Sequence, residues 1–423
     1  MAKVNVLIFP VGDVNSVELH NALSTCVNIE VFGATSIDRH GEYIYKNYIS
    51  GLPLITEENF IEEFNRVLVD NQIDFIFPVH DTVVTFLADN RDKIKAKIMC
   101  ADTKTSQICR DKKLIYEIFS DCSFNPIVYK DFSELPVFAK PRKGQGGVGA
   151  FCVQNETDIP NIDISDYVIC EYLPGIEYSV DCITDNDGVL RFISPRSRKR
   201  TMAGISVAGQ NEKLTQEIEH IAKTINERLK FNGLWFFQIK QDKNKKWKLL
   251  EIATRHATSM SFTRAIGVNL PLLSIYLAMG KPININPNKY NVKMDSTLIR
   301  RYKIDYDYET VYFDFDDTLI IKEQVYLPAI SFLFQCKNKG IKVILLTKHE
   351  KEIYQTMKKY HIDSSIFNEI IHIEMNDKKS KYINPNKAIF IDNSFQERQD
   401  VSINCNIPVF DVDGIDVLID WRK

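Results

Sequence analysis

Pro136–Val153 reads PVFAKPRKGQGGVGAFCV, a glycine-rich segment. Gly144, Gly146 and Gly149 match the G-x-G-x-x-G pattern of dinucleotide-binding folds. That pattern needs a helix directly after the glycines, because the helix N-terminus holds the pyrophosphate. The residues that follow, Ala150–Val153, are apolar and favour a strand instead. We therefore expect a glycine-rich hairpin between two strands.

A lysine lies on the strand that enters this hairpin. Glycines let backbone N–H groups approach phosphate oxygens closely, and Lys140 would add a positive charge beside them. Protein kinases also cover phosphates with a strand, a loop and a strand, but their phosphate-binding lysine follows the loop. A flexible surface hairpin without a ligand is the alternative. Glycines close to a lysine favour a phosphate-binding hairpin, with Lys140, Gly144, Gly146 and Gly147 as candidate residues.

The composition of the chain excludes several classes of protein. Its 423 residues are 44% apolar and 26% charged, as in a globular protein with two or three domains. A net charge of −3 provides no general attraction to nucleic acid or anionic membranes, and we expect neither as a partner. No segment approaches the ~18 apolar residues of a membrane span, and Val4–Phe9 is too short for a signal peptide. Nine dispersed cysteines without a C-x-x-C pair predict reduced thiols and a cytoplasmic location.

Residues 1–105 alternate short apolar runs with segments of helical periodicity. Val4–Phe9 and Phe75–Pro78 predict buried parallel strands, and Val17–Leu23 and Phe60–Val69 predict helices. Because strands that alternate with helices favour a parallel sheet, we expect an α/β domain over this range.

Residues 106–300 combine many strands with few helices and predict an α+β domain. Thr215–Lys230 is the clear amphipathic helix. Two polar stretches, Asn284–Lys293 and Arg300–Glu309, predict a linker, after which a third domain of the α/β class runs over residues 301–423. The expected strands of the middle domain are Val137–Lys140, Ala150–Val153, Tyr167–Cys170, Tyr178–Ile183, Leu234–Ile239 and Lys248–Ile252.

Further motifs follow one another around the glycine hairpin. PVHD at Pro78–Asp81 follows an expected strand of the first domain, and Asp111-Lys112 opens a helix ahead of the hairpin. After it come EYLPG at Glu171–Gly175, GIEYSVD at Gly175–Asp181, LWFFQ at Leu234–Gln238, LLEI at Leu249–Ile252, and Arg255. In this order the motifs resemble the ATP-grasp superfamily, particularly the carboxylate–amine ligases and the large subunit of carbamoyl-phosphate synthase. The resemblance implies a pre-ATP-grasp α/β domain followed by an ATP-grasp fold.

The resemblance also implies a site for ATP and Mg²⁺, with Mn²⁺ as a substitute. Glu171 and Leu173 match the adenine-binding hinge, and Glu177 matches the ribose-binding acid. Gln238 and Glu251 fall at the metal-binding strand positions. The implied ATP-binding residues are Lys112, Lys140, Gly144, Gly146, Gly147, Glu171, Leu173 and Glu177, with Arg255 as the catalytic, phosphate-contacting arginine.

The charge of ATP supports this assignment, but the sequence departs from the family pattern at two positions of the metal site. ATP carries about four negative charges, which lysines, an arginine and Mg²⁺ would neutralise. Gln238 is neutral where many relatives carry an acid. Ala253 cannot bind metal where the family's Glu-x-Asn-x-Arg has its Asn, so a second Mg²⁺ would be held mainly by Glu251 and phosphate.

The basic run Ser194–Arg200, SPRSRKR, resembles the family's acceptor-binding segment, with Arg196 and Arg198 for a carboxylate. A solvated basic hairpin is the alternative, and His256 either lines the same pocket or is a buried structural histidine. In the family a carboxylate is phosphorylated and an amine then displaces the phosphate. We therefore expect a ligase for small-molecule carboxylates and amines, with a carbamoyl-phosphate-synthase-like kinase of a carboxylate or carbamate as the alternative.

A second set of motifs lies in the C-terminal domain. Val311–Leu319, VYFDFDDTL, contains D-x-D-x-T after an apolar strand and resembles motif one of the haloacid dehalogenase (HAD) superfamily. Residues two apart on a strand share a face, so Asp314 and Asp316 would project together, one as nucleophile and one as general acid/base. Capping of the next helix by these acids is the alternative interpretation.

The later motifs of that superfamily also follow in order. Thr347 ends the apolar strand Val343–Leu346 and matches the phosphate-holding hydroxyl, and Lys379 is the favoured lysine. Asp392 ends the strand Ala388–Ile391. The resemblance implies catalytic roles for Asp314, Asp316, Thr347 and Lys379, with Asp314, Asp316 and Asp392 as Mg²⁺ ligands, whereas Asn393 and Glu397 depart from the frequent aspartates.

The spacing of the HAD-like motifs leaves no room for a cap domain. Thr318 and Thr347 are only 29 positions apart, which accommodates one helix and one strand. We therefore expect a capless, open, Rossmann-like phosphatase domain that takes a phosphorylated substrate; a regulatory or scaffolding domain is the alternative. The whole chain is thus predicted to be a multidomain protein of the α/β and α+β classes that acts as a monomer or homodimer.

Overall fold

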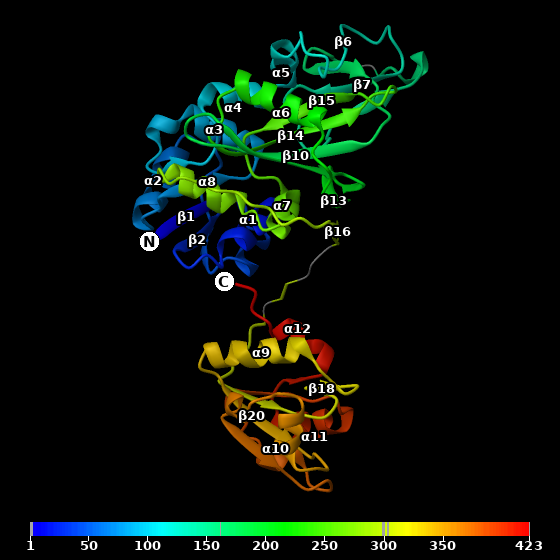
Figure 1. Cartoon of the computed structure of the whole chain (residues 1–423). Coiled ribbons are helices and arrows are strands. Elements are labelled where there is room, and N and C mark those ends of the chain that lie inside the picture. The colour runs from blue at the N-terminus through cyan, green and yellow to red at the C-terminus, as the bar shows by residue number, and fades with distance from the viewer. Residues whose placement is uncertain (1–2, 161, 298–300, 303, 423) are drawn as a thin grey trace. The chain divides into compact units, whose positions relative to one another are not determined.

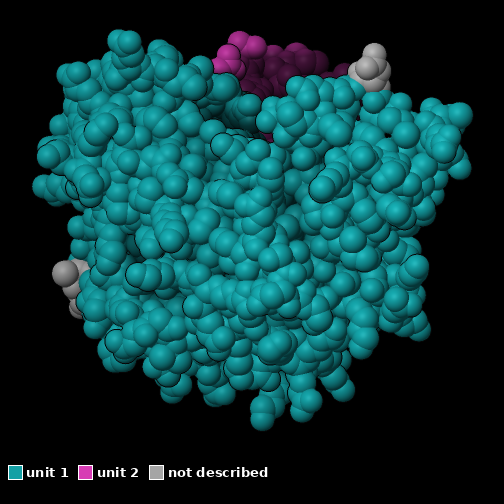
Figure 2. Space-filling view, turned by 90° about the horizontal axis from the view of Figure 1, so that it is seen from above, with its two compact units in different colours: residues 1–298, 423 teal, residues 299–422 magenta. Residues whose placement is uncertain are grey.

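The computed structural model describes residues 3–160, 162–297, 301–302 and 304–422 (Figure 1). The chain divides into two units, residues 1–298 and 299–422 (Figure 2). The expected border between residues 300 and 301 adjoins residues 298–300, which lie outside the described residues. In the described ranges, no helix combines the length and apolar character needed to cross a lipid bilayer.

A parallel sheet forms the N-terminal part of the first unit, in the order β3-β2-β1-β4-β5. Its central strand β1 is apolar except at Asn5 because both faces are buried: Val6 and Ile8 pack in one core cluster, and Leu7 and Phe9 in another. The strands are β1 Val4–Phe9, β2 Ile29–Ala34, β3 Asn47–Ile49, β4 Phe75–Pro78 and β5 Lys97–Ile98, and the helices are α1 Val14–Leu23, α2 Phe60–Asp70 and α3 Asp81–Asp89. The two strands and two helices predicted here are confirmed.

The strand order places a crevice between the carboxyl ends of β1 and β4. The chain builds outward from β1 to β2 and β3 on one side, then crosses to β4 and β5 on the other. Open α/β sheets bind ligands at this kind of switch point. The loop after β1 contains Asp13, which caps α1 by accepting a hydrogen bond from the Ser16 N–H, and the loop after β4 contains His80 and leads into Asp81.

The glycine-rich segment joins β7 Val137–Pro141 to β8 Phe151–Val153, an antiparallel pair, as predicted. These strands form a four-stranded sheet with β6 Val128–Tyr129 and β9 Tyr167–Glu171. Two helices precede it, α4 Thr103–Arg110 and α5 Lys112–Ile118. Asp111 caps α5 through its hydrogen bond from the Lys113 N–H, which confirms the helix start predicted at Asp111-Lys112.

A larger antiparallel sheet follows in the order β11-β10-β14-β15. One face packs against α6, because Ile218, Ile221 and Ile225 lie in one core cluster with Val180 and Trp235 (Figure 1). Side chains alternate along a strand, so the polar residues at the intervening positions project from the opposite face. The bounds are β10 Glu177–Thr184, β11 Leu190–Ser197, β14 Gly233–Gln241, β15 Trp247–Ala253 and α6 Gln216–Arg228, and they confirm the predicted strands and helix.

The remaining elements of the first unit correct the prediction of a linker at Asn284–Lys293. Asn288 donates its N–H to the Ile266 carbonyl, and the Tyr290 hydroxyl donates to the Ala265 carbonyl. Lys293 then opens a strand of a small third sheet, so this stretch is fixed to the first unit rather than free. The sheet contains β12 Arg200–Met202, β13 Ile205–Gln210 and β16 Lys293–Asp295, next to the helices α7 Ser261–Ala265 and α8 Leu270–Ala278.

The second unit is built on a parallel five-stranded sheet in the order β21-β20-β17-β22-β23. Counted along the unit, this is the strand order of the N-terminal sheet, with the crevice between β17 and β22. Asp314 and Asp392 directly follow these two strands. The strands are β17 Thr310–Phe313, β20 Lys342–Thr347, β21 Glu369–His372, β22 Ala388–Ile391 and β23 Val409–Phe410, with the hairpin β18 Ile320–Ile321 and β19 Gln324–Val325 and the helices α9 Leu327–Asn338, α10 Ile353–Lys359, α11 Phe395–Cys405 and α12 Ile415–Leu418.

Candidate active sites

The first unit contains a cavity of about 860 Å³, a size typical of small-molecule sites. Its walls come from the glycine loop, from the polar face of β10, β14 and β15, and from the loops after β1 and β4. The predicted residues that line it are Lys112, Lys140, Gly144, Gly146, Gly147, Glu177, Arg198, Gln238, Glu251 and Arg255.

Two buried lysines give the cavity its positive charge. Lys112 Nζ donates to the Gly144 carbonyl at 3.1 Å, and Lys140 Nζ donates to the Leu250 carbonyl at 3.2 Å. In the described part of the chain no carboxylate lies within ion-pair distance of either ammonium group. Burial, reinforced by the charge of Lys112, lowers the pKa of Lys140. Removing two unneutralised cations from water is costly unless an anion joins them, so this pair suits a polyanionic ligand.

The glycine loop is shaped for close approach. Gly146 and Gly147 adopt left-handed φ values of 62° and 75°, which other residues rarely adopt. Gly204, in the turn between β12 and β13, packs directly on this loop, and a Cβ there would lie 2.1 Å from the Gly146 carbonyl oxygen. Arg110 and Lys112 both donate to the Gly144 carbonyl at 3.1 Å. The loop is thus held from two sides at the edge of the cavity.

A row of oxygen-bearing side chains crosses the sheet on the cavity face. Ser179, Gln238 and Glu251 are register partners on β10, β14 and β15, and all three line the cavity. Glu177, at the start of β10, pairs with Arg198 Nε at 2.7 Å. Carboxylate and amide oxygens are ligands that Mg²⁺ accepts, usually together with phosphate oxygens and water. Gln238 and Glu251 fit such a partial shell.

The side chains of the described residues do not form a complete metal site by themselves. Among the described residues, no three or more His, Cys, Asp or Glu side chains are grouped closely enough to hold a metal ion. Mg²⁺ is often bound by one or two carboxylates plus substrate phosphates. A metal ion in this cavity would therefore also need oxygen atoms from a bound ligand.

Arg255 does not lie free in the cavity, because it forms two hydrogen bonds to Asp81, from Nε at 2.5 Å and from Nη2 at 3.0 Å. Next to it, His256 is fully buried, and burial lowers its pKa to about 3, helped by the charge of Arg255. His256 is therefore neutral at physiological pH. Of its two interpretations, the structure supports the buried structural histidine, because His256 does not line the cavity.

Three predicted residues lie outside the cavity lining. Glu171 accepts a hydrogen bond from the Ile127 N–H at 2.9 Å, and Leu173 is buried. Arg196 is 2% exposed and pairs with Asp181 at 2.8 Å, while its Nε donates to the Ser259 carbonyl. A buried, neutralised guanidinium cannot reach a substrate in this arrangement. Adenine contacts of Glu171 and Leu173 stay predictions, and Arg196 is a structural residue here rather than an acceptor ligand.

Several cavity residues were missed by the sequence analysis. Phe138 and Leu250 supply apolar walls, and Phe138 lies two positions before Lys140 on the same strand. The loops after β1 and β4 contribute Asp13, Asn15 and His80. Burial raises the pKa of Asp13 and lowers that of His80. These loops follow the carboxyl ends of β1 and β4, which are neighbours in the parallel sheet. Ligands bind at this edge of α/β sheets, so the predicted strand ends could have identified the loops.

Two hydroxyl groups in the lining have no partner within the described residues. Ser179 is 1% exposed and Ser206 is 4% exposed, yet neither Oγ makes a hydrogen bond there. Buried polar groups are nearly always hydrogen-bonded, so unpartnered hydroxyls beside a cavity mark places where a ligand or water completes the bonding.

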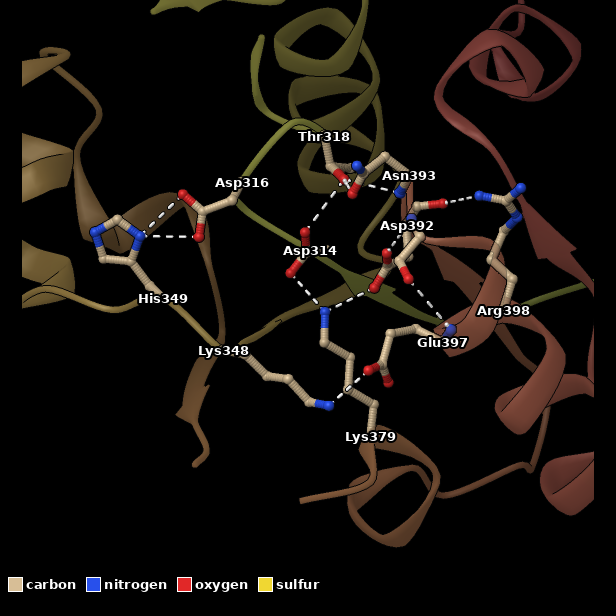
Figure 3. Close-up of polar contacts among 11 residues, drawn as sticks. Asp314, Asp316, Thr318, Lys348, His349, Lys379, Asp392, Asn393, Glu397 and Arg398 are labelled. Atoms are coloured by element: carbon tan, nitrogen blue, oxygen red, sulfur yellow. Dashed lines mark hydrogen bonds and ion pairs between the residues drawn. The ribbon is translucent and has the colours of Figure 1, made fainter. Parts of the chain in front are cut away.

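The second unit has its own polar cavity of about 580 Å³ at the carboxyl ends of β17 and β22. Lys379 lies at its base, with Nζ 2.5 Å from Asp314 Oδ1 and 2.6 Å from Asp392 Oδ2 (Figure 3). All three side chains are at least nine-tenths buried. The fold thus brings together three residues that are far apart in the sequence and that the HAD-like motifs predicted as neighbours.

The charges of this cluster do not cancel. Burial raises the pKa of Asp314 to about 6 and also raises that of Asp392, although Lys379 opposes both shifts. Burial alone would lower the pKa of Lys379, but the two carboxylates outweigh it and raise it. Two carboxylates therefore share one ammonium group. The negative charge left over fits a divalent cation beside Asp314 and Asp392.

Thr318 contacts one carboxylate of the cluster, and Thr347 ends β20, the strand beside β17. Thr347 is fully buried, and its Oγ1 has no hydrogen-bond partner within the described residues. Thr318 contacts Asp314 Oδ2 and receives the Asn393 N–H at 3.1 Å. Thr347 is not among the residues that line the cavity, so its phosphate-holding role stays a prediction. Glu397, a further expected acid, pairs instead with Lys348 at 2.5 Å.

Asp316 points away from Asp314 and toward His349 (Figure 3). Both of its carboxylate oxygens lie 2.9 Å from His349 Nδ1. Asp316 is therefore in the cavity lining but does not join the Lys379 cluster, which qualifies the expectation that the two aspartates project together. The strand β17 ends at Phe313, before Asp314, so the alternation of a regular strand does not extend to Asp316.

Comparison with known proteins bears on the first unit. Residues 163–300 match the family model described as ATP-grasp in the biosynthetic pathway with Ter operon. No curated protein matches the chain in sequence.

Three solved structures share the fold of about two thirds of the chain. Biotin carboxylase from Campylobacter jejuni, in complex with β,γ-ATP, has 15% identity over 66% of this chain and 72% of its own, with a TM-score of 0.54. L-amino acid ligase from Bacillus licheniformis has 14% identity over 65% and 74%, with a TM-score of 0.53. The biotin carboxylase domain of the Hydrogenobacter thermophilus 2-oxoglutarate carboxylase, with MgADP and bicarbonate, has 16% identity over 68% and 72%, with a TM-score of 0.54.

These likenesses concern fold, and they agree with the order of motifs around the glycine hairpin. The first unit therefore shares the fold of these ATP-grasp-like structures, and residues 163–300 match an ATP-grasp family model.

Proposed function

We propose that the first unit is an ATP- and Mg²⁺-dependent ligase that joins a carboxylate to an amine through an acyl phosphate. The observation that carries this proposal is the pair of buried lysines, Lys112 and Lys140, which line one cavity together with Gln238 and Glu251. Cations without carboxylate partners and a partial oxygen shell suit a triphosphate with its metal. The fold supports the proposal, since two of the similar structures carry ATP- or ADP-type ligands.

In this scheme the substrate carboxylate attacks the γ-phosphorus, the bond to the β-phosphate oxygen breaks, and ADP leaves. Lys112 and Lys140 stabilise the charge that moves onto the phosphate oxygens, and the glycine loop excludes water. Gln238 and Glu251 would hold Mg²⁺, which neutralises phosphate charge when bound. Phe138 and Leu250 supply apolar walls suited to the adenine ring.

The amine would enter from the side of the N-terminal sheet. Its nitrogen attacks the acyl carbon, inorganic phosphate leaves, and the nitrogen loses a proton. Because burial lowers the pKa of His80, its imidazole is neutral near physiological pH and suits acceptance of that proton. Asp13 and Asn15 lie in the same wall and suit binding of the amine, and Arg198 suits the carboxylate.

The direct test is release of ADP by the full chain across a panel of amino acids, sugar acids and amines, with products identified by mass spectrometry. Lys140→Ala should abolish ADP release, whereas Lys143→Ala, an exposed lysine of the same loop outside the cavity lining, should retain it. ADP release that needs a carboxylate but no amine would favour the kinase alternative. Equal activity of both variants would contradict the proposal.

We also propose that the second unit is a Mg²⁺-dependent phosphatase of the HAD type. The buried Asp314–Lys379–Asp392 cluster at the carboxyl ends of β17 and β22 supports it. Asp314 would attack the substrate phosphorus, the bond to the leaving oxygen would break, and Asp316 would protonate that oxygen. Water would then attack the phosphorus of the aspartyl phosphate and give its proton to Asp316, releasing inorganic phosphate. Asp314 and Asp392 would hold Mg²⁺, which shields phosphate charge when bound.

Hydrolysis of 4-nitrophenyl phosphate with Mg²⁺ tests this second activity. The wild-type chain should turn the substrate over, and Asp314→Asn should abolish turnover because it removes the nucleophile. No turnover by the wild-type chain would favour the regulatory or scaffolding alternative. Nine unpaired cysteines support a reducing, cytoplasmic setting for both activities.

A further inference from the structure

Asp316 and His349 form a contact that no motif of the sequence predicts. His349 Nδ1 lies 2.9 Å from each carboxylate oxygen of Asp316, and its Nε2 lies 2.8 Å from the Thr356 hydroxyl (Figure 3). The Asp316 side chain is 53% exposed, whereas that of His349 is 9% exposed. A buried imidazole thus fixes an exposed carboxylate.

Asp316 depends on this contact for its position. Within the described residues, its carboxylate makes hydrogen bonds to His349 and to no other side chain. An exposed aspartate normally samples several rotamers, and fixing it costs conformational entropy. A group that must donate and then accept a proton during one catalytic cycle gains from a fixed position, because proton transfer needs hydrogen-bond distance to the reacting oxygen.

His349 is itself held from several directions. Its ring packs edge-on against Phe315 with centroids 5.4 Å apart, and Thr356 on α10 contacts Nε2. Its backbone carbonyl accepts a hydrogen bond from His372 Nε2 at 2.6 Å. His349 lies two positions after Thr347, the last residue of β20, so the anchor of Asp316 directly follows the strand that carries the buried threonine. The contact is therefore part of a rigid framework.

We propose that His349 is a positioning residue that holds Asp316 as the general acid/base of the second site, with Thr356 fixing the imidazole. This inference rests on the proposed phosphatase function of that site. In this proposal Asp316 protonates the leaving oxygen. The loss of His349 should therefore slow the reaction most for substrates whose leaving group must be protonated. A nitrophenolate leaves without a proton, whereas an alkoxide does not.

Two isosteric substitutions separate the two contacts of the ring. In His349→Asn the amide nitrogen can occupy the place of Nδ1 and still donate to Asp316. In His349→Gln it can occupy the place of Nε2 and contacts Thr356 only. Thr356→Val removes the anchor of the ring, and Lys358→Ala, an exposed residue of the same helix, serves as the control. All variants are measured as the full chain with Mg²⁺, on 4-nitrophenyl phosphate and on an alkyl phosphate such as glycerol phosphate.

We expect His349→Gln to lower kcat for the alkyl phosphate by about 100-fold with little change in KM, as for loss of a general acid. On 4-nitrophenyl phosphate the first turnover should stay near the wild-type rate, and only the later hydrolysis of the aspartyl phosphate should slow. His349→Asn should recover most of the loss, Thr356→Val should fall between the two, and Lys358→Ala should match the wild type.

Equal losses in the Asn and Gln variants, or losses that do not depend on the leaving group, would overturn the positioning role and assign His349 to packing. The phosphatase proposal would stand in that case, provided that Asp314→Asn is inactive. If the wild-type chain hydrolyses neither substrate, the phosphatase proposal fails and this inference fails with it.

Discussion

Arg255 and Asp81 are joined by two hydrogen bonds, although 174 positions separate them in the chain. Asp81 begins α3 after the parallel sheet, and Arg255 follows β15 of the antiparallel sheet. The pair therefore fastens the loop that carries His80 to the strand that carries Glu251. This contact therefore joins two walls of the first cavity.

We expect Asp81→Asn to destabilise the first unit by about 3 kcal/mol at pH 7, because it leaves a buried guanidinium without its partner. Burial alone would raise the pKa of Asp81, but Arg255 outweighs it and holds that pKa below the ordinary value. The stabilisation is therefore complete above the pKa of the unfolded carboxyl and is lost as the pH falls through the folded pKa. Denaturant unfolding at several pH values measures it.

The difference between wild type and Asp81→Asn should accordingly narrow below about pH 5. Asp92→Asn, an exposed aspartate of the same part of the unit, should change the free energy of unfolding by less than about 0.5 kcal/mol. A constant difference at every pH would mean that the ion pair contributes nothing through charge.

A second pH dependence of the free energy of unfolding is expected from His256, for a different reason. Burial lowers its pKa to about 3, whereas the unfolded imidazole has a pKa of 6.5. Below pH 6.5 the unfolded state gains a proton that the folded state does not bind, so stability falls as the pH falls. Between pH 7 and pH 5 this single group should cost about 2 kcal/mol of unfolding free energy.

The measurement compares wild type with His256→Leu, which removes the titrating group and keeps an apolar side chain of similar size. The variant should lack that share of the pH dependence, whatever its stability at pH 7. Parallel curves for the two proteins between pH 7 and pH 5 would show that the pKa of His256 is the same in the folded and unfolded states.

Gly204 provides a test of the glycine loop. A Cβ at Gly204 would lie 2.1 Å from the Gly146 carbonyl oxygen, so Gly204→Ala must push the two loops apart. We expect the Kd for an ATP analogue to rise at least about tenfold, a loss of about 1.4 kcal/mol. Isothermal titration calorimetry on the full chain measures it.

Gly188→Ala is the matched control. Gly188 has φ 79° and Gly204 has φ 76°, but a Cβ at Gly188 would meet nothing within 4 Å. Both variants share the backbone strain of an alanine in the left-handed region, about 1 kcal/mol. Nucleotide binding that weakens equally in both variants would attribute the effect to strain and not to the contact of the two loops.

Much of this architecture could be predicted from the sequence, because buried parallel strands leave short, mostly apolar runs. Val4–Phe9, Phe75–Pro78 and Ala388–Ile391 have the bounds predicted for them. The hairpin was predictable for a related reason, since β-prone residues follow the glycines where a Rossmann turn needs a helix. Lys112 and Lys140 both line one cavity. The motif order placed them in one site because the local patterns and the order of motifs agree.

The rest depended on tertiary contacts between side chains. Arg196 was expected to bind a substrate, but Asp181 on the neighbouring strand β10 neutralises it, a contact set by strand register. Whether a charged residue meets solvent, ligand or a buried partner is decided by such tertiary contacts, which no local pattern contains. His349 was unpredictable for the same reason.

The central prediction is that the first cavity binds a nucleoside triphosphate. A crystal structure of the full chain with Mg²⁺ and a non-hydrolysable ATP analogue tests it most directly. We expect the triphosphate between the glycine loop, with Lys112 and Lys140, and the strand that carries Glu251. An analogue bound elsewhere, or absent from this cavity at saturating concentration, would contradict the account.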